Sequence, residues 1–167
     1  MNKVLLKNAF VHPITQSPFY GDVLIGEGII LDIGFNLTVS SDAKVHDCAG
    51  LHLFPGFIDV HTHLGLYDEG IGWAGHDAND TLEPLSPHIR AFDGVYPLDP
   101  AFAEARGAGI TTAHILPGSS NIIGGTTSVI KTSGMNIQKM IVKETAGLKI
   151  ALGENPKRIH SSGQKKS

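Results

Sequence analysis

Two histidines separated by one residue are the side chains of this sequence best suited to bind a metal ion. His61 and His63 end a string that begins with Leu-Phe-Pro-Gly and continues as Phe-Ile-Asp-Val-His-Thr-His. The Pro-Gly pair marks a boundary, and the apolar, β-branched run after it predicts a buried strand. Because side chains alternate along a strand, the two imidazoles would share one face and could converge on one cation. Imidazole nitrogen suits zinc, iron and nickel.

A bare His-x-His pair also occurs on solvated strand faces, so its context matters. The string Pro-Gly-Phe-Ile-Asp-Val-His-Thr-His, residues 55–63, resembles the first barrel strand of the amidohydrolase superfamily of metal-dependent hydrolases. The rival His-x-His family, of the metallo-β-lactamase type, has Asp-His where this chain has Gly65 and Leu66. The resemblance implies that His61 and His63 are metal ligands.

The resemblance also implies a cofactor and a reaction. The cofactor would be a divalent metal, zinc as the first expectation, with manganese, iron or nickel as alternatives. A metal-activated water would hydrolyse carbon–nitrogen bonds of a small-molecule substrate, either non-peptide bonds or those of cyclic amides. No residue of this chain is assigned the catalytic proton transfer, because the family's Asp on the last barrel strand has no counterpart here.

A third metal ligand is expected near the C-terminus. The string Ala-Leu-Gly-Glu-Asn-Pro-Lys-Arg, residues 151–158, resembles an imidazolonepropionase-like subgroup of the family. Alternation over residues 148–154 predicts a strand with Glu154 at its C-terminal end, where barrel enzymes place catalytic groups. Some relatives have a metal-binding Glu on the third strand, so Glu154 would be a ligand or a bridge. The alternative is that Glu154 caps a turn with the Asn-Pro that follows it.

Candidate substrate contacts lie on the long segment 67–98, which is rich in Gly and Pro and leaves the strand end that carries the histidines. Loops of this length are functional or disordered. We expect Trp73, His76 and Asn79 to contact substrate. His114, within a predicted strand over residues 110–116, is a further candidate. Its position before the strand's end also fits a hydrogen-bonded core histidine.

The elements that must position these residues predict an α/β fold. Residues 1–54 contain short predicted strands, including a hairpin across Gly26-Glu27-Gly28. We expect this segment to form the antiparallel part of a β-sandwich. Residues 55–167 read as the first three or so βα units of a TIM-type (β/α)8 barrel, because a helix starting after Asp99-Pro100 separates two strands. A complete barrel takes about 250 residues, so the barrel is incomplete.

Two functions therefore remain open. The chain is the N-terminal portion of a carbon–nitrogen hydrolase, or it is a truncated, catalytically inactive family member that acts as an interaction or metal-binding protein. In either case we expect an oligomer or a requirement for the missing C-terminal half, because an open barrel leaves a strand edge unpaired.

The composition and charge of the chain argue against disordered, nucleic-acid-binding, disulfide-rich and membrane proteins. With 17% charged and 41% hydrophobic residues and a net charge of -3, the chain is globular, and nothing suggests a nucleic-acid or anionic-membrane partner. The single cysteine, Cys48, rules out an internal disulfide and fits a reducing compartment. Neither a signal peptide nor a membrane-spanning run is evident, so a cytoplasmic location is expected.

Overall fold

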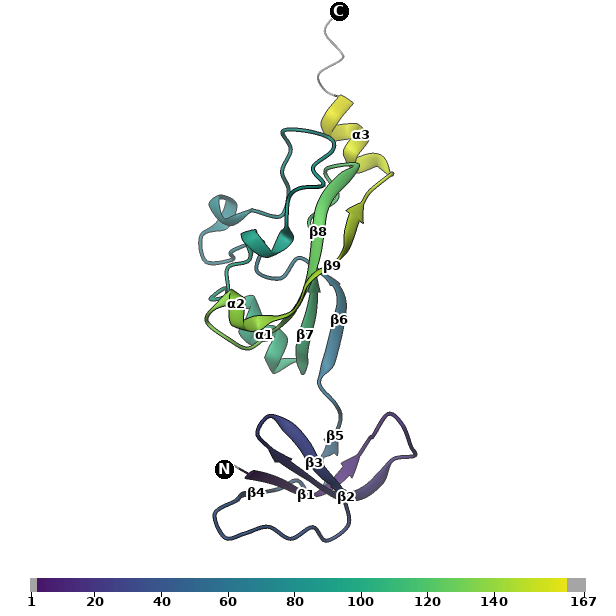
Figure 1. The fold of residues 1–167 in the computed structure, drawn as a ribbon, viewed down its shortest axis with the longest axis vertical. Coiled ribbons are helices and arrows are strands. Elements are labelled where there is room, and N and C mark those ends of the chain that lie inside the picture. Colours follow the sequence, from purple (N-terminus) through teal and green to yellow (C-terminus); the bar gives the residue numbers. More distant parts are fainter. Residues whose placement is uncertain (1–2, 162–167) are drawn as a thin grey trace, which may run out of the picture. The chain divides into compact units, whose positions relative to one another are not determined.

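The computed structural model describes residues 3–161, and the chain divides into two compact units, Met1–Pro55 and Gly56–Ser167. The first unit is built around one sheet with the strand order β3-β2-β1-β4, in which β5 also pairs with β1 (Figure 1). Its strands are β1 (Lys3–Val11), β2 (Phe19–Gly26), β3 (Ile29–Gly34), β4 (Lys44–Asp47) and β5 (His52–Leu53).

The hairpin expected across Gly26-Glu27-Gly28 is confirmed as the connection between β2 and β3, which pair antiparallel. Glu27 and Gly28 have φ angles of 52° and 76°, and positive φ at both central residues is the turn whose twist matches that of paired strands. However, β4 and β5 both pair parallel to β1, so the sheet is mixed. Parallel pairing is possible because the long segment 35–43 lets the chain return in the same direction.

The second unit contains a sheet with the order β6-β7-β8-β9 (Figure 1). Its strands are β6 (Phe57–Thr62), β7 (Ile110–Ile115), β8 (Ile123–Lys131) and β9 (Ile141–Ile150). Its helices are α1 (Ala101–Gly107), α2 (Ile137–Met140) and α3 (Glu154–His160), and two short 3-10 turns, η1 (Gly72–Gly75) and η2 (Ala91–Gly94), lie in the long loop.

The fold class is confirmed as a β-rich segment followed by an incomplete barrel sheet. The expected strand–helix–strand unit is β6-α1-β7, with β6 and β7 parallel. After it, β8 pairs antiparallel with both β7 and β9. Strands β6, β7 and β9 therefore run in one direction, and β8 runs in the opposite direction between the last two.

The core of the second unit lies where the long loop and α1 pack on the sheet. It includes Leu66 from the loop, Phe102 from α1, Ile115 from β7 and Ile130 from β8, each at most 2% exposed. Burying each of these large side chains contributes about 1.5–3 kcal/mol. This packing fixes the start of the loop directly after His63.

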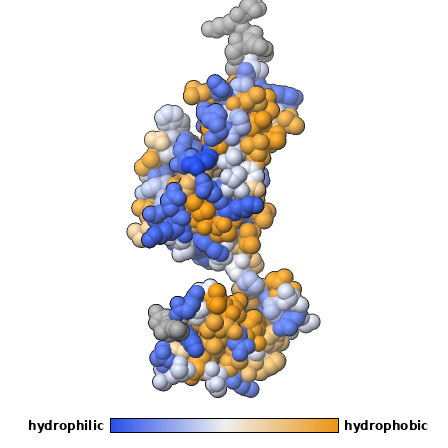
Figure 2. Space-filling model, in the orientation of Figure 1, coloured by the Kyte–Doolittle hydropathy of each residue, from blue (hydrophilic) through white to orange (hydrophobic). Residues whose placement is uncertain are grey.

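Strand β6 is less buried than its sequence predicts. Ile58 and Val60 are 63% and 72% exposed, because β6 is an edge strand among the described residues. Figure 2 shows further hydrophobic surface over the first unit. Ile29, Ile30 and Val45 are exposed hydrophobic residues of this unit. None of the helices in residues 3–161 is long and apolar enough to cross a membrane.

Candidate metal centre

His61 lies one residue before the end of β6, and His63 directly follows the last residue of the strand, Thr62. Their ring centroids are 5.9 Å apart with an angle of 81° between the planes. Two imidazoles that bind one tetrahedral cation, each through a nitrogen at about 2.0–2.1 Å, have centroids roughly 5 Å apart. The two rings are therefore close to the separation that a shared cation requires.

A bulge in β6 sets the direction of these side chains. Asp59 is opposite Ala113 and Thr62 is opposite Ile115, so β6 has one more residue than β7 over this stretch. Bulges re-aim side chains and are frequent beside active sites. Within the bulge, the backbone N–H of His61 donates to Oδ1 of Asp59 at 3.0 Å. Asp59 thereby holds the backbone from which the His61 ring projects.

The orientation of His63 is fixed from the neighbouring strand. Its Nδ1 lies 2.7 Å from the carbonyl oxygen of Leu116, just past the end of β7. Since a carbonyl oxygen can only accept, Nδ1 carries the proton, and in the neutral ring Nε2 keeps a lone pair. The N–H of Leu116 donates to the carbonyl oxygen of Thr62 at 3.0 Å, which locks the two strand ends together. Metal-binding histidines usually have such a second partner.

Glu154 is not on a strand, contrary to the expectation. β9 ends at Ile150, and Glu154 is the first residue of α3. Its side chain is 87% exposed and forms an ion pair with Nζ of Lys157 at 3.1 Å. The physical reason is local: Pro156 falls in the first helical turn, where proline is tolerated, and an acid at a helix start is favourable. Metal binding by Glu154 stays a prediction, and in residues 3–161 no group of three His, Cys, Asp or Glu side chains is placed to hold a metal ion.

His114 connects three strands. Its Nδ1 lies 3.1 Å from the carbonyl oxygen of Val60 on β6, and its Nε2 lies 2.7 Å from Oγ1 of Thr127 on β8. Both ring nitrogens are thus engaged, which agrees with the alternative of a hydrogen-bonded core histidine. A contact from His114 to substrate stays a prediction that would require one of these bonds to break.

The loop candidates differ in how closely the structure brings them to His63. Asn79 lines a cavity of about 300 Å³ together with His63 and Tyr67. The His76 ring packs edge-on against Tyr67 at 5.0 Å, and Tyr67 packs in the same manner against His63 at 6.1 Å. Trp73 is 87% exposed in η1. Asn79 is therefore the loop candidate that shares a cavity with His63.

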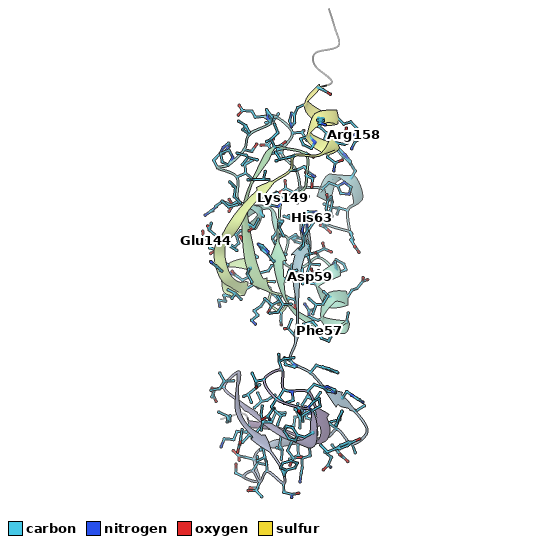
Figure 3. All side chains as sticks on the ribbon, turned by 90° about the vertical axis from the view of Figure 1, so that its right-hand side faces the viewer. Phe57, Asp59, His63, Glu144, Lys149 and Arg158 are labelled. Atoms are coloured by element: carbon cyan, nitrogen blue, oxygen red, sulfur yellow. The ribbon has the colours of Figure 1, made fainter. Side chains whose placement is uncertain are left out.

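The same cavity is lined by Ser119 and Ser120 of the Gly-Ser stretch after β7, and by Asn155 and Arg158, which the sequence reasoning did not single out. Figure 3 labels Arg158 on α3 and His63 at the end of β6. The signal available in the sequence was the Glu-Asn-Pro-Lys-Arg string, of which only the acid was considered. Arg158, two residues after the proline, reaches the cavity because the chain forms a helix there.

Lys149 is a buried cation close to this end of the sheet. It lies on β9 and is 8% exposed. Its stem packs over Gly124, where an added Cβ would lie 3.4 Å from Cγ of Lys149. Burial lowers the pKa of the Lys149 amine below its usual value.

Comparison with known proteins identifies the family, although no family model matches the chain. The amidohydrolase tasK of Hapsidospora irregularis is 32% identical over 157 residues, covering 85% of this chain and 16% of that protein. A dihydroorotase of Caldanaerobacter subterraneus is 42% identical over 62 residues, covering 37% of this chain and 14% of that protein.

The structural comparison agrees. The crystal structure of an amidohydrolase from Thermotoga maritima MSB8 matches with a TM-score of 0.91 and 46% sequence identity, covering 96% of this chain and 42% of that chain. The chain thus spans less than half the length of these relatives. The amidohydrolase tasK and the Thermotoga maritima amidohydrolase match 85% and 96% of this chain. Together with the His-x-His strand end, these matches show that the chain belongs to the amidohydrolase superfamily.

Proposed function

We propose that this chain supplies the start of the metal centre, and part of the substrate cavity, of a hydrolase that acts on non-peptide or cyclic carbon–nitrogen bonds. The observation that supports this most is the bond from Nδ1 of His63 to the carbonyl of Leu116, beside the ring of His61. That arrangement presents one bare imidazole nitrogen next to a second imidazole.

The donor set fits a divalent cation in type but is incomplete in number. Two neutral imidazoles suit zinc first, and manganese, iron or nickel as well. Catalytic zinc sites use three protein ligands, and Glu154 would have to leave Lys157 to become the third. The proposal therefore places the remaining ligands outside this chain, in a longer protein or a partner, in keeping with the greater length of its relatives.

Within the site, each residue of this chain has a defined task. His61 and His63 would hold the cation, and the Leu116 carbonyl would keep the His63 ring in the required tautomer. A cation held there supplies the Lewis acidity that polarises a scissile carbonyl and activates water. Asn79 would orient substrate from the loop, because its side chain reaches the same cavity as His63.

The second candidate is a metal-binding or interaction protein without catalysis of its own. The exposed apolar residues of the edge strand β6 favour it, because such an edge pairs readily with another chain.

The experiment that tests the hydrolase proposal isolates this chain through a tag from its own source cells, with whatever copurifies. The preparation is assayed with cyclic amides, N-acyl amino acids and dipeptides, with and without chelator. We expect chelator-sensitive hydrolysis that is lost in His63→Ala. Turnover that survives His63→Ala would contradict the proposed role, and no turnover with any of these substrates would favour the second candidate.

A further inference from the structure

A cavity in the first unit has two aromatic side chains and a buried acid in its wall. The cavity measures about 290 Å³ and is lined by Asn8 of β1, by Tyr20, Gly21 and Asp22 of β2, and by Phe35 and Asn36, which follow β3. All six residues lie in the first unit, whereas the two histidines of the candidate metal centre lie in the second. A ligand of this cavity would therefore be bound without the metal centre.

Asp22 places a negative charge at the cavity. The residue is 3% exposed. Its Oδ1 accepts a hydrogen bond from the N–H of Asn8, and its Oδ2 accepts one from the N–H of Leu37, each at 2.9 Å. Because both oxygens act as acceptors, the arrangement fits the ionised carboxylate. Each oxygen keeps a second lone pair that can accept from a further donor.

The charge of Asp22 is not balanced by a cationic side chain. Within residues 3–161, Asp22 forms no ion pair with a lysine, arginine or histidine. A buried charge is costly unless it is paired, and for that reason buried carboxylates usually have a cation beside them. A cationic ligand in the cavity would supply this partner.

The two aromatic rings of the wall are anchored on one side and remain exposed on another. Tyr20 packs on Phe10 with ring centroids 4.7 Å apart, and Phe35 packs on Phe19 at 5.2 Å. Even so, Tyr20 is 68% exposed and Phe35 is 70% exposed. Aromatic faces attract cations, and covering exposed rings removes apolar surface from water. The wall thus combines an acid with aromatic surface, which is the lining that a small organic cation prefers.

We propose that this cavity binds a primary arylalkylammonium ion, that is, a small amine with one aromatic ring. The ammonium group donates to the free lone pairs of Asp22, and Tyr20 and Phe35 cover the apolar body of the ligand. The side-chain oxygens of Asn8 and Asn36 are further acceptors in the same wall. A cavity of about 290 Å³ suits a molecule of one ring and a short chain. The proposal is independent of the hydrolase function.

The test compares benzylammonium with benzyl alcohol, which has nearly the same shape and no charge at neutral pH. Each compound is titrated into the chain of residues 1–167. Binding is followed by the backbone amide resonances of Asn8 and Leu37, whose N–H groups donate to Asp22. We expect benzylammonium to shift both resonances and to bind about tenfold more tightly than the alcohol. Equal affinity for the two compounds would overturn the proposal.

The place of binding is tested in the same titration. The loop of the second unit has acids of its own, because Asp77, Asp80 and Asp93 line a cavity of about 630 Å³. If benzylammonium shifts resonances of that loop and leaves those of Asn8 and Leu37 unchanged, the cation binds to the loop acids and the proposal is wrong.

Variants of the aromatic wall make the test specific. Tyr20→Leu and Phe35→Leu should each weaken benzylammonium binding about two- to fivefold, because each removes one aromatic face. Phe54→Leu is the matched control, since Phe54 is an exposed aromatic residue of the same unit that does not line the cavity. An equal loss in Phe54→Leu, or no loss in either wall variant, contradicts the proposal.

Asp22→Asn tests the charge itself. The variant keeps the shape of the side chain and one acceptor oxygen, so it should bind benzylammonium no more tightly than benzyl alcohol. Its amide spectrum shows whether the first unit is still folded, and if it is not, the two wall variants decide the question. A preference for benzylammonium that persists in folded Asp22→Asn would overturn the proposal.

Discussion

Nδ1 of His63 lies 2.7 Å from the carbonyl oxygen of Leu116, although the two residues are 53 positions apart in the chain. The bond exists only because β6 and β7 pair in parallel and end at the same edge of the sheet. It determines which nitrogen of His63 is available, and the predictions below concern the elements that keep this edge in place.

His114 should act as a structural connection between β6 and β8. His114→Phe removes both of its hydrogen bonds and leaves the Val60 carbonyl without this donor, so we expect a loss of about 1–3 kcal/mol in the free energy of unfolding. Urea denaturation measures it. Thr127→Val, which removes only the hydroxyl partner, should cost less, and a His114→Phe variant as stable as the unmodified chain would show that these bonds contribute nothing.

Gly65 should be required for the turn that follows His63. Its φ is 79°, and an added Cβ would lie 2.8 Å from Cε2 of Phe102 and 2.9 Å from Cγ1 of Val95. Both the backbone conformation and the core contact oppose a side chain, so Gly65→Ala should destabilise the second unit by about 1–3 kcal/mol.

The matched control is Gly107→Ala at the end of α1, where nothing lies within 4 Å of an added Cβ. That substitution should be neutral or stabilising by up to about 1 kcal/mol, because alanine favours the helix. Equal thermal shifts for the two variants would contradict this account of Gly65.

The stability of the second unit should depend on the charge of Lys149. Burial lowers the pKa of Lys149 in the folded state from the value of 10.5 that it has when exposed. Between the two pKa values the unfolded chain binds more protons, so stability rises with pH in this window and is constant below it. Denaturation as a function of pH should show this rise, and Lys149→Met should abolish it and stabilise the unit at neutral pH.

Lys143, an exposed lysine on the same strand, provides the comparison. Lys143→Met should leave the pH dependence unchanged. If the rise below pH 10.5 persists in Lys149→Met, a group other than Lys149 causes it.

The purified chain by itself should not be a competent hydrolase. It brings together two imidazoles, whereas catalytic zinc sites use three protein ligands and ordered partners around them. Zinc- or manganese-loaded chain should therefore show no turnover of cyclic amides, N-acyl amino acids or dipeptides. Metal-dependent turnover that disappears in His61→Ala would show that other copies of the chain complete the site.

Turns and helix starts were predicted correctly where the backbone preferences of a few neighbouring residues determine them. The Gly26-Glu27-Gly28 turn and the helix after Asp99-Pro100 are specified by backbone preferences, and both are observed. Glu154 was misplaced because strand alternation over residues 148–154 was given more weight than the helix-start signal of Pro156.

Tertiary contacts could not be read from the sequence. The pairing of His114 with Thr127 and the approach of Leu116 to His63 depend on strand register, which no local pattern fixes. The place of Arg158 in the cavity depends on α3 being tied to Asn121 through His160. The exposure of β6 follows from its position at the edge of the sheet, although its composition is that of a buried strand.

Metal binding by the purified chain tests the central claim most directly. Equilibrium dialysis against zinc, with metal analysis, should show binding that falls in His61→Ala and in His63→Ala. The control is His52→Ala, which breaks a close imidazole pair of the first unit, in which Nε2 of His12 lies 2.8 Å from Nδ1 of His52. We predict that His52→Ala binds zinc as the unmodified chain does. Zinc binding that survives both β6 variants, or that is lost in His52→Ala alone, would contradict the assignment of His61 and His63 as the metal ligands.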